Sequence, residues 1–230
     1  GLLAKKYHFV VMSFSGMGES EWRSQYDKDT FVEDVWGVVK ETNLIKPVVV
    51  GHSFGGMVSL STADKYGDQM SGLVLVDFVV RHPENHIEWY KNMPPSKPPK
   101  VRASKEELVQ RFRLMPPQEC QNQYLLDFIA EKSVRKTDQG WSWTFDPSTY
   151  DNLEVGNDQH ETLMQLNCPV SFIYGENTME FDTGNSIEEM KELLPEGSSV
   201  VALADAQHHL MLDKPIEFVD ELDKLIQGFF

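Results

Sequence analysis

A buried strand runs directly into a helix at residues 48–60, which read VVVGHSFGGMVSL. Three valines predict the strand, a helical pattern follows from Phe54, and between them Gly51, Ser53 and Gly55 form the pattern G-x-S-x-G. Such an abrupt turn strains the corner residue, and glycines, which lack Cβ, let strand and helix approach closely on both sides. The corner hydroxyl then stands clear of the sheet, and the N–H of Phe54 at the start of the helix is placed to stabilise a developing oxyanion. The stretch therefore predicts a nucleophilic serine at position 53.

Strands and helices are predicted to alternate through most of the chain. Apolar runs typical of strands cover residues 7–14, 48–50, 73–80, 169–174 and 199–203. Helical patterns cover residues 30–42, 54–66, 161–165, 186–193 and a last segment from near Asp213, and Thr30 and Glu33 have the spacing of a capping box. This alternation predicts an α/β fold, with a mostly parallel sheet covered by helices on both faces.

The alternation stops between residues 81 and 150. This segment contains a proline-rich stretch at 93–100, two predicted helices near 104–114 and 122–132, and an aromatic cluster at 141–145. We therefore expect residues 1–80 and 151–230 to form the core and residues 81–150 to form an inserted helical cap.

The charge balance bears on possible partners. The 230 residues carry a formal net charge of −15 at pH 7, which disfavours binding to nucleic acid or to an anionic membrane. No apolar run approaches the 18 residues that would span a bilayer. The two cysteines, Cys120 and Cys168, have no zinc-ligand spacing and are expected to be reduced thiols of a cytoplasmic protein.

These motifs together resemble the α/β-hydrolase family. The run GHSFGG resembles its nucleophile elbow, residues 15–20 (SGMGES) are similar to the loop after its preceding strand, and residues 81–150 resemble its cap. Members usually begin with three more strands and a His-Gly loop that supplies a second oxyanion donor. No His-Gly pair precedes Phe14 here, so we expect the natural chain to be longer at its N-terminus.

The resemblance also implies a base. The family's catalytic histidine lies in the loop between the last strand and the last helix, typically seven residues before a proline. That register selects His208, with Pro215 as the proline, and leaves His209 as a packing neighbour. His52 adjoins the nucleophile, but adjacent side chains diverge at this turn, so it is expected to contact substrate and not to act as the base.

The acid is less directly indicated. Family members commonly carry it as G-x-x-D after the strand that matches residues 169–174, but residues 175–178 here read GENT, and the threonine hydroxyl cannot balance an imidazolium. Other members carry the acid one strand earlier, where this chain has Asp77. We take Asp77 as the acid, because an ionised aspartate at the end of an apolar strand is costly unless it is paired. Glu176, Glu180 and a dyad without an acid remain as alternatives.

The resemblance implies a serine hydrolase that cleaves a carboxylic ester, or a related acyl bond, of a small and partly apolar substrate through an acyl-enzyme. No metal or organic cofactor is implied, and the expected partner is a small molecule. The substrate is expected to contact aromatic residues of the cap, namely Phe112, Trp141 and Trp143.

Two other functions stay open. The first is a carbon–carbon bond hydrolase acting on an acidic ring-fission product, for which Arg81, Arg111 and Arg113 would supply positive charge. The second is a non-catalytic ligand-binding member of the same fold.

Overall fold

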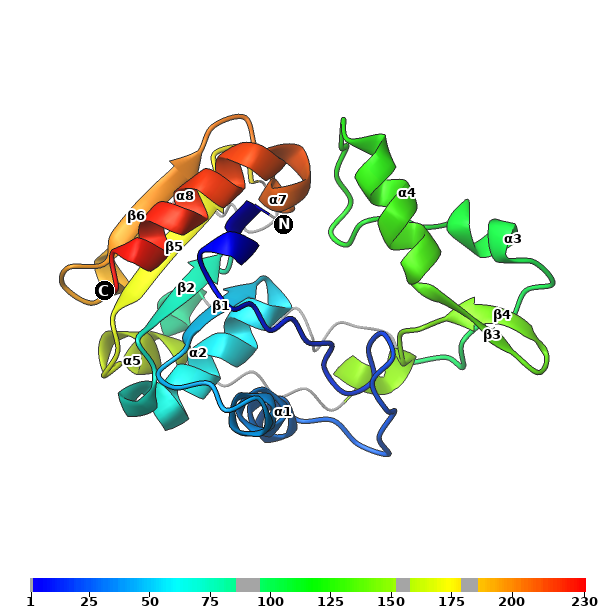
Figure 1. The fold of residues 1–230 in the computed structure, drawn as a ribbon, viewed down its shortest axis with the longest axis horizontal. Helices are drawn as coiled ribbons and strands as arrows, with labels where there is room; N and C mark the ends of the chain where they lie inside the picture. Colours follow the sequence, from blue (N-terminus) through cyan, green and yellow to red (C-terminus); the bar gives the residue numbers. More distant parts are fainter. Residues whose placement is uncertain (1, 86–95, 152–157, 179–185) are drawn as a thin grey trace. The chain divides into compact units, whose positions relative to one another are not determined.

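The computed structural model describes residues 2–85, 96–151, 158–178 and 186–230 (Figure 1). The chain forms two compact units, the first made of residues 1–10, 35–87 and 156–230 and the second of residues 11–34 and 88–155. Helix α1 (Lys28–Glu41) passes from the second unit into the first. The predicted boundaries of a cap at residues 81 and 150 stay a prediction.

A four-stranded parallel sheet forms the centre of the first unit. Its strands, in spatial order, are β1 (Val48–His52), β2 (Gly72–Val76), β5 (Val170–Gly175) and β6 (Ser199–Leu203). The helices of this unit are α2 (Phe54–Tyr66), α5 (Gln159–Met164), α6 (Ser186–Leu193), α7 (Leu210–Asp213) and α8 (Pro215–Gln227), with 3-10 turns η1 (Leu2–Lys5), η2 (Gly67–Gln69) and η3 (Pro83–Asn85). The predicted α/β class and parallel sheet are confirmed.

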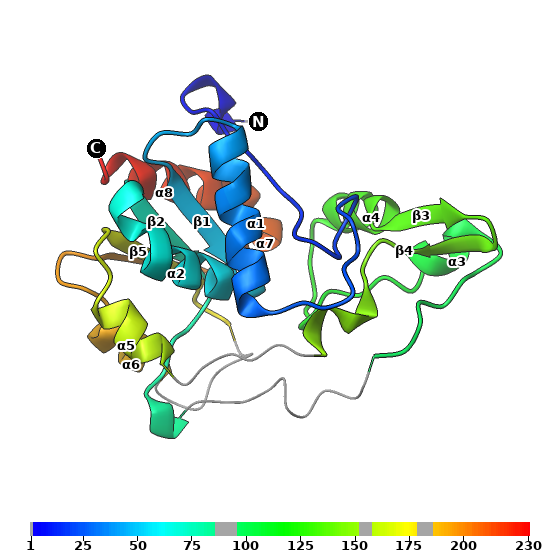
Figure 2. The same ribbon diagram turned by 90° about the horizontal axis from the view of Figure 1, so that it is seen from below.

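Helices cover both faces of this sheet, because successive strand residues point to opposite faces. Leu73 and Leu75 of β2 pack with α1, α2, α5 and α6, whereas Val74 and Val76 pack with α7 and α8. Figure 2 shows α8 and α2 on opposite sides of the strands. Every residue of β2 is buried, as expected for a central parallel strand.

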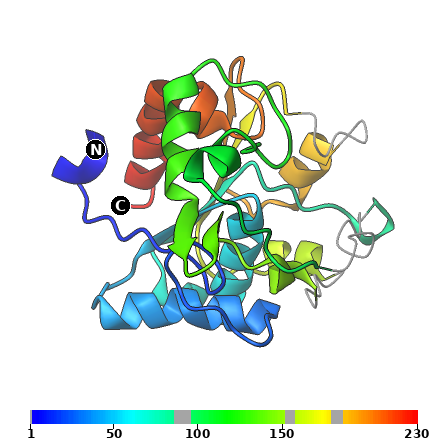
Figure 3. The ribbon, with the colours of Figure 1, turned by 90° about the vertical axis from the view of Figure 1, so that its right-hand side faces the viewer.

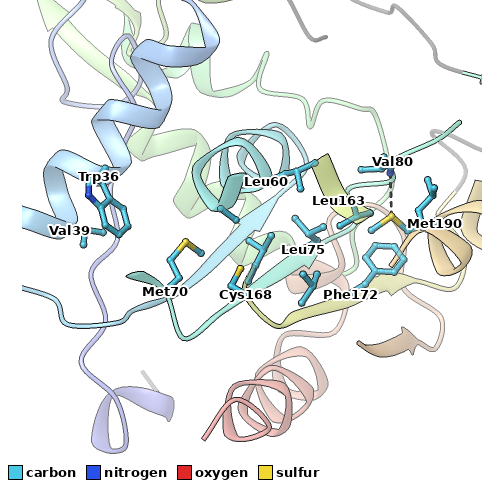
Figure 4. Packing of buried hydrophobic residues seen from close by; sticks show 14 residues of the cluster. Trp36, Val39, Leu60, Met70, Leu75, Val80, Leu163, Cys168, Phe172 and Met190 are labelled. Atoms are coloured by element: carbon cyan, nitrogen blue, oxygen red, sulfur yellow. Dashed lines mark hydrogen bonds between the residues drawn. The ribbon is translucent and has the colours of Figure 1, made fainter. Parts of the chain in front are cut away.

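The larger of the two cores lies on the α2 face. Figure 4 shows Leu60 of α2 and Met190 of α6 around Leu75 and Phe172 of the sheet. Each of these side chains is at most 1% exposed. Burial of a side chain of this size contributes about 1.5–3 kcal/mol, so packing on this face stabilises the sheet.

The predicted strand over residues 7–14 is absent, and this expectation was wrong. The segment is apolar but largely open to solvent, with Val11 91% exposed. Within the described ranges β1 pairs with β2 alone, so residues 7–14 do not add a strand at the β1 edge of the sheet. Two side chains connect the start of the chain to α8 instead. Tyr7 donates a 2.9 Å hydrogen bond to Asp223 of this helix, and Lys6 forms an ion pair with the same carboxylate. Figure 3 shows η1 beside α8.

The start of one helix and the end of one strand also differ from expectation. Helix α1 begins before Thr30, because the Asp27 carboxylate accepts a 2.7 Å hydrogen bond from the Thr30 N–H, so the predicted capping box at Thr30 is not the start of the helix. Strand β2 ends at Val76 and not at Val80, because Asp77 has a φ of +43° that a strand does not accommodate.

The second unit contains a hairpin as well as helices. Its elements are α3 (Lys105–Val109), α4 (Gln123–Lys132), β3 (Val134–Thr137), β4 (Gly140–Trp143) and a 3-10 turn, η5 (Pro147–Tyr150). Strands β3 and β4 pair antiparallel, so the segment expected as a helical cap contains a hairpin beside its helices. Alternating large and small residues in GWSW have the two-residue period of a strand, and this signal is too short to stand out beside the helical patterns before it.

A buried carboxylate ties distant parts of the second unit together. Asp146 accepts a 2.7 Å hydrogen bond from the Tyr26 hydroxyl and also caps η5 through the Ser148 N–H. Tyr26 in turn stacks on Phe31, with 6.0 Å between ring centroids. These contacts join residues 11–34 to the segment that follows the hairpin.

Candidate active site

Ser53 occupies a strained corner between β1 and α2. His52 is paired in register with Val76 of β2, and the Ser53 N–H continues this ladder with a 3.1 Å bond to the Val76 carbonyl. The next step of the chain is bent, with Ser53 at φ +52° and ψ −118°, a conformation that costs a non-glycine residue about 1–3 kcal/mol. Helix α2 begins immediately at Phe54, so the predicted strand–turn–helix context of this serine is present.

Close packing at this corner requires Gly51 but not Gly55. A Cβ on Gly51 would lie 2.2 Å from the Ser59 hydroxyl and 2.3 Å from the Gly55 carbonyl oxygen. A Cβ on Gly55 would meet nothing within 4 Å. On the helix side the close approach depends instead on Gly56, where a Cβ would lie 2.4 Å from the Phe78 Cβ, so glycines permit close packing on both sides of the serine.

Asp77 lies at the neighbouring strand end, one residue beyond Val76. Its N–H bonds to the Ile173 carbonyl of β5 at 2.8 Å, and its side chain is fully buried. The carboxylate accepts three hydrogen bonds: from the Gly175 N–H at 2.7 Å on Oδ2, and from the Thr178 hydroxyl and His208 Nδ1, both at 2.9 Å, on Oδ1. A buried ionised carboxylate needs partners of this kind, and here one of them is an imidazole.

His208 lies in the loop between β6 and α7 and is 3% exposed. The Asp77 carboxylate can only accept a hydrogen bond, so the ring nitrogen of His208 that faces it, Nδ1, must donate one. The neutral ring therefore carries its proton on Nδ1, and Nε2 bears the lone pair. This is the tautomer that a general base needs for taking a proton from a hydroxyl.

The His208 loop is bonded to α7 on one side and packs closely on the end of β5 on the other. The Gln207 N–H donates a 2.8 Å hydrogen bond to the Asp213 carboxylate at the end of α7. Gly175, at the end of β5, lies so close that a Cβ there would be 2.4 Å from the Gln207 carbonyl oxygen. The loop backbone is therefore fixed on both sides of its approach to Asp77.

His52 lies beside this histidine and bonds to its main chain. His52 Nε2 is 2.9 Å from the His208 carbonyl oxygen, so Nε2 carries the proton and donates it. The two rings are 4.7 Å apart between centroids. Burial, followed by the proximity of His208, lowers the pKa of His52 from 6.5 to about 4, so this ring is neutral at physiological pH.

The structure separates the candidate acids. Asp77 is hydrogen-bonded to His208, Glu176 is exposed to solvent, and Glu180 lies outside the described residues. His209 contacts both other imidazoles, with its ring centroid 5.0 Å from that of His208.

The expected cap residues lie in the second unit. Phe112 and Trp143 contact each other, with ring centroids 6.3 Å apart, and Trp141 pairs through its main chain with Arg102. Arg113 donates to the main-chain carbonyls of Gln110 and Phe112. A substrate role for these aromatic residues stays a prediction.

Sequence reasoning missed the supporting residues Thr178, Gly175 and Asp213. In the sequence, the GENT stretch marks Thr178 as a departure from the family pattern and gives no sign of its contact with Asp77. For Asp213, the available signal was its place just before Pro215 at a helix junction, a position that suggests a cap. Within the described ranges, no three His, Cys, Asp or Glu side chains form a group that could hold a metal ion.

The model of the alpha/beta hydrolase fold matches residues 1–215. The chain belongs to the α/β-hydrolase family. Among curated proteins, it is 23% identical over 207 residues to the sn-1-specific diacylglycerol lipase ABHD11 of Danio rerio, covering 86% of this chain and 63% of that protein. A 75-residue stretch is 35% identical to the carbendazim hydrolyzing esterase of Nocardioides sp., covering 33% of this chain and 30% of the esterase.

Solved structures show the same fold. An esterase from Mycobacterium tuberculosis superposes with a TM-score of 0.75 at 19% identity, covering 93% of this chain and 73% of the esterase. An E-2-(acetamidomethylene)succinate hydrolase superposes with a TM-score of 0.71 at 18% identity, covering 93% and 79% respectively. This α/β-hydrolase chain thus spans less than two thirds of the length of the Danio rerio lipase and less than one third of the esterase. Over the described residues, no helix is both long and apolar enough to cross a bilayer.

Proposed function

We propose that this chain is a serine hydrolase that cleaves a carboxylic ester, or a related acyl bond, with Ser53 as nucleophile, His208 as base and Asp77 as acid. The observation that carries the proposal is the buried hydrogen bond of 2.9 Å between Asp77 Oδ1 and His208 Nδ1. It fixes the tautomer of an imidazole whose ring centroid lies 4.7 Å from that of His52, the residue before the strained Ser53. The lipase and esterase relatives support the same class of bond.

In the first half of this reaction, the Ser53 hydroxyl attacks the carbonyl carbon while its proton passes to His208 Nε2. The imidazolium that forms is stabilised by Asp77, and the oxyanion by the Phe54 N–H at the start of α2. His208 then returns the proton to the departing alcohol, which leaves an acyl group on Ser53.

In the second half, water is the nucleophile. His208 takes a proton from the water as it attacks the acyl carbon, and the carboxylic acid leaves as Ser53 regains its proton. His52 remains neutral throughout, since its pKa is about 4, so it adds no positive charge beside the imidazolium. The substrate is a small molecule with an apolar part, and the cap residues Phe112, Trp141 and Trp143 are proposed to contact it.

Covalent labelling tests the nucleophile. A fluorophosphonate probe is expected to label the wild-type protein but not Ser53→Ala. The control variant Ser61→Ala should be labelled like wild type, because Ser61 is a serine of α2 whose hydroxyl already bonds to the Met57 carbonyl. Equal labelling of Ser53→Ala and wild type would contradict this assignment.

A substrate panel then separates the reactions. Esters of increasing acyl length are assayed beside an acidic ring-fission product. Turnover of esters supports the proposal. Turnover of the ring-fission product alone would replace it with carbon–carbon bond hydrolysis, and an unlabelled, inactive protein would favour a ligand-binding role.

A further inference from the structure

The Thr178 hydroxyl contacts the same carboxylate oxygen that contacts the histidine. Thr178 Oγ1 donates to Asp77 Oδ1 at 2.9 Å, and His208 Nδ1 reaches that oxygen at the same distance. The other oxygen, Oδ2, accepts from the Gly175 N–H. The carboxylate is thus held at both oxygens by residues of a single turn, 175–178.

This turn is itself bonded to the loop that carries the histidine. The Thr178 N–H closes the turn on the Gly175 carbonyl at 3.0 Å, and the Asn177 N–H bonds to the Ala206 carbonyl at 2.8 Å. The Glu176 N–H bonds to the Leu203 carbonyl at the end of β6. Residues 175–178 therefore hold Asp77 by its side chain and the His208 loop by its backbone.

The side chain of an aspartate restricts rotation of its carboxylate about the Cβ–Cγ bond only weakly. Hydrogen-bond donors therefore decide which way its lone pairs point. With the Gly175 N–H on one oxygen and the Thr178 hydroxyl on the other, the carboxylate plane is fixed, and Oδ1 is directed at His208 Nδ1.

We propose that Thr178 is a positioning residue, whose hydroxyl orients the Asp77 carboxylate toward His208. The threonine that occupies the place of an expected acid thus supports the acid at its other location. This inference rests on the proposed function, because it assigns Thr178 a part in the same triad.

Three single variants test it. Thr178→Val keeps the shape of the side chain and removes the hydroxyl, Thr178→Ser keeps the hydroxyl, and Thr62→Val removes a buried threonine hydroxyl that bonds to the Val58 carbonyl within α2. We expect Thr178→Val to lower kcat about tenfold, equivalent to about 1.4 kcal/mol, with KM changed less than about twofold. Thr178→Ser and Thr62→Val are expected to retain kcat within about threefold of wild type.

A double variant distinguishes positioning from a general structural role. In the Asp77→Asn background, Thr178→Val is expected to cause little further loss of kcat, because the carboxylate that the hydroxyl orients is gone. The full tenfold loss in that background, or an unchanged kcat in Thr178→Val alone, would overturn the inference.

A spectroscopic measurement keeps the inference separate from the proposed function. We expect the proton between His208 Nδ1 and Asp77 to give a downfield ¹H resonance, which would be assigned by its loss in His208→Gln. We expect Thr178→Val to shift this resonance and Thr178→Ser to restore it. If the probe does not label Ser53 in the wild-type protein, the proposed function fails. The positioning role of Thr178 is then tested by this resonance alone. A resonance unmoved in Thr178→Val would then overturn the positioning role.

Discussion

Replacing Asp77 by asparagine tests the triad most directly, because the substitution keeps the shape of the side chain but makes one of its two terminal atoms a donor. The carboxylate accepts on both oxygens, from the Gly175 N–H on one and from Thr178 and His208 on the other. An amide cannot satisfy all three donors. With its NH₂ toward Gly175, two N–H groups face each other. With its NH₂ toward His208, the ring must move its proton from Nδ1 to Nε2.

The expected losses follow from these two arrangements. A buried donor left without an acceptor costs about 1–3 kcal/mol, so the free energy of unfolding should fall by that amount. An imidazole in the wrong tautomer cannot accept the Ser53 proton, and substitutions of this kind lower kcat by roughly 10³- to 10⁴-fold, or about 4–5.5 kcal/mol of transition-state stabilisation.

The assay is the hydrolysis of an activated ester, with kcat corrected for the fraction of folded protein. Glu176→Gln is the matched control, because Glu176 is a solvent-exposed carboxylate of the same turn, and it should retain kcat within about twofold. The reasoning is refuted if Asp77→Asn keeps kcat within tenfold of wild type, or if Glu176→Gln shows the larger loss.

Three further predictions concern stability. Gly51→Ala should lower the free energy of unfolding in urea by about 1–3 kcal/mol, because its Cβ would meet Ser59. Gly55→Ala should leave it unchanged, because its Cβ would point into open space, and equal losses would contradict the packing argument. His52 has a folded pKa of about 4 against 6.5 unfolded, so its contribution is complete above pH 6.5 and lost as the pH falls toward 4. The free energy of unfolding, measured in urea, should fall by about 3 kcal/mol over that window in wild type and by less in His52→Gln. Identical pH profiles for the two proteins would exclude His52 as the cause of the loss. Phe172→Ala, at a fully buried position, should cost about 3–5 kcal/mol by thermal unfolding, and a loss below 1 kcal/mol would show that the α2-face core does not depend on this ring.

The local elements were largely readable from the sequence. Helices α2 and α6 and strand β6 have the predicted bounds, because a glycine or a proline lies within two residues of an end of each. Residues 7–14 were misread, because an apolar run predicts a strand only if another strand is there to pair with it. The hairpin β3–β4 was missed for the opposite reason, since its pairing depends on a partner strand that a short period-two pattern does not specify.

The sequence by itself determined the strand–turn–helix at Ser53 and the loop position of His208, because both are local patterns in which neighbouring residues set the backbone conformation. Only the tertiary structure decided which carboxylate meets the imidazole. Asp77 and His208 are 131 residues apart, and they meet because parallel strands bring their carboxyl ends to one edge of the sheet. The same packing placed Thr178 on Asp77 and His52 on the His208 carbonyl, contacts set by strand order and register that no spacing along the chain encodes.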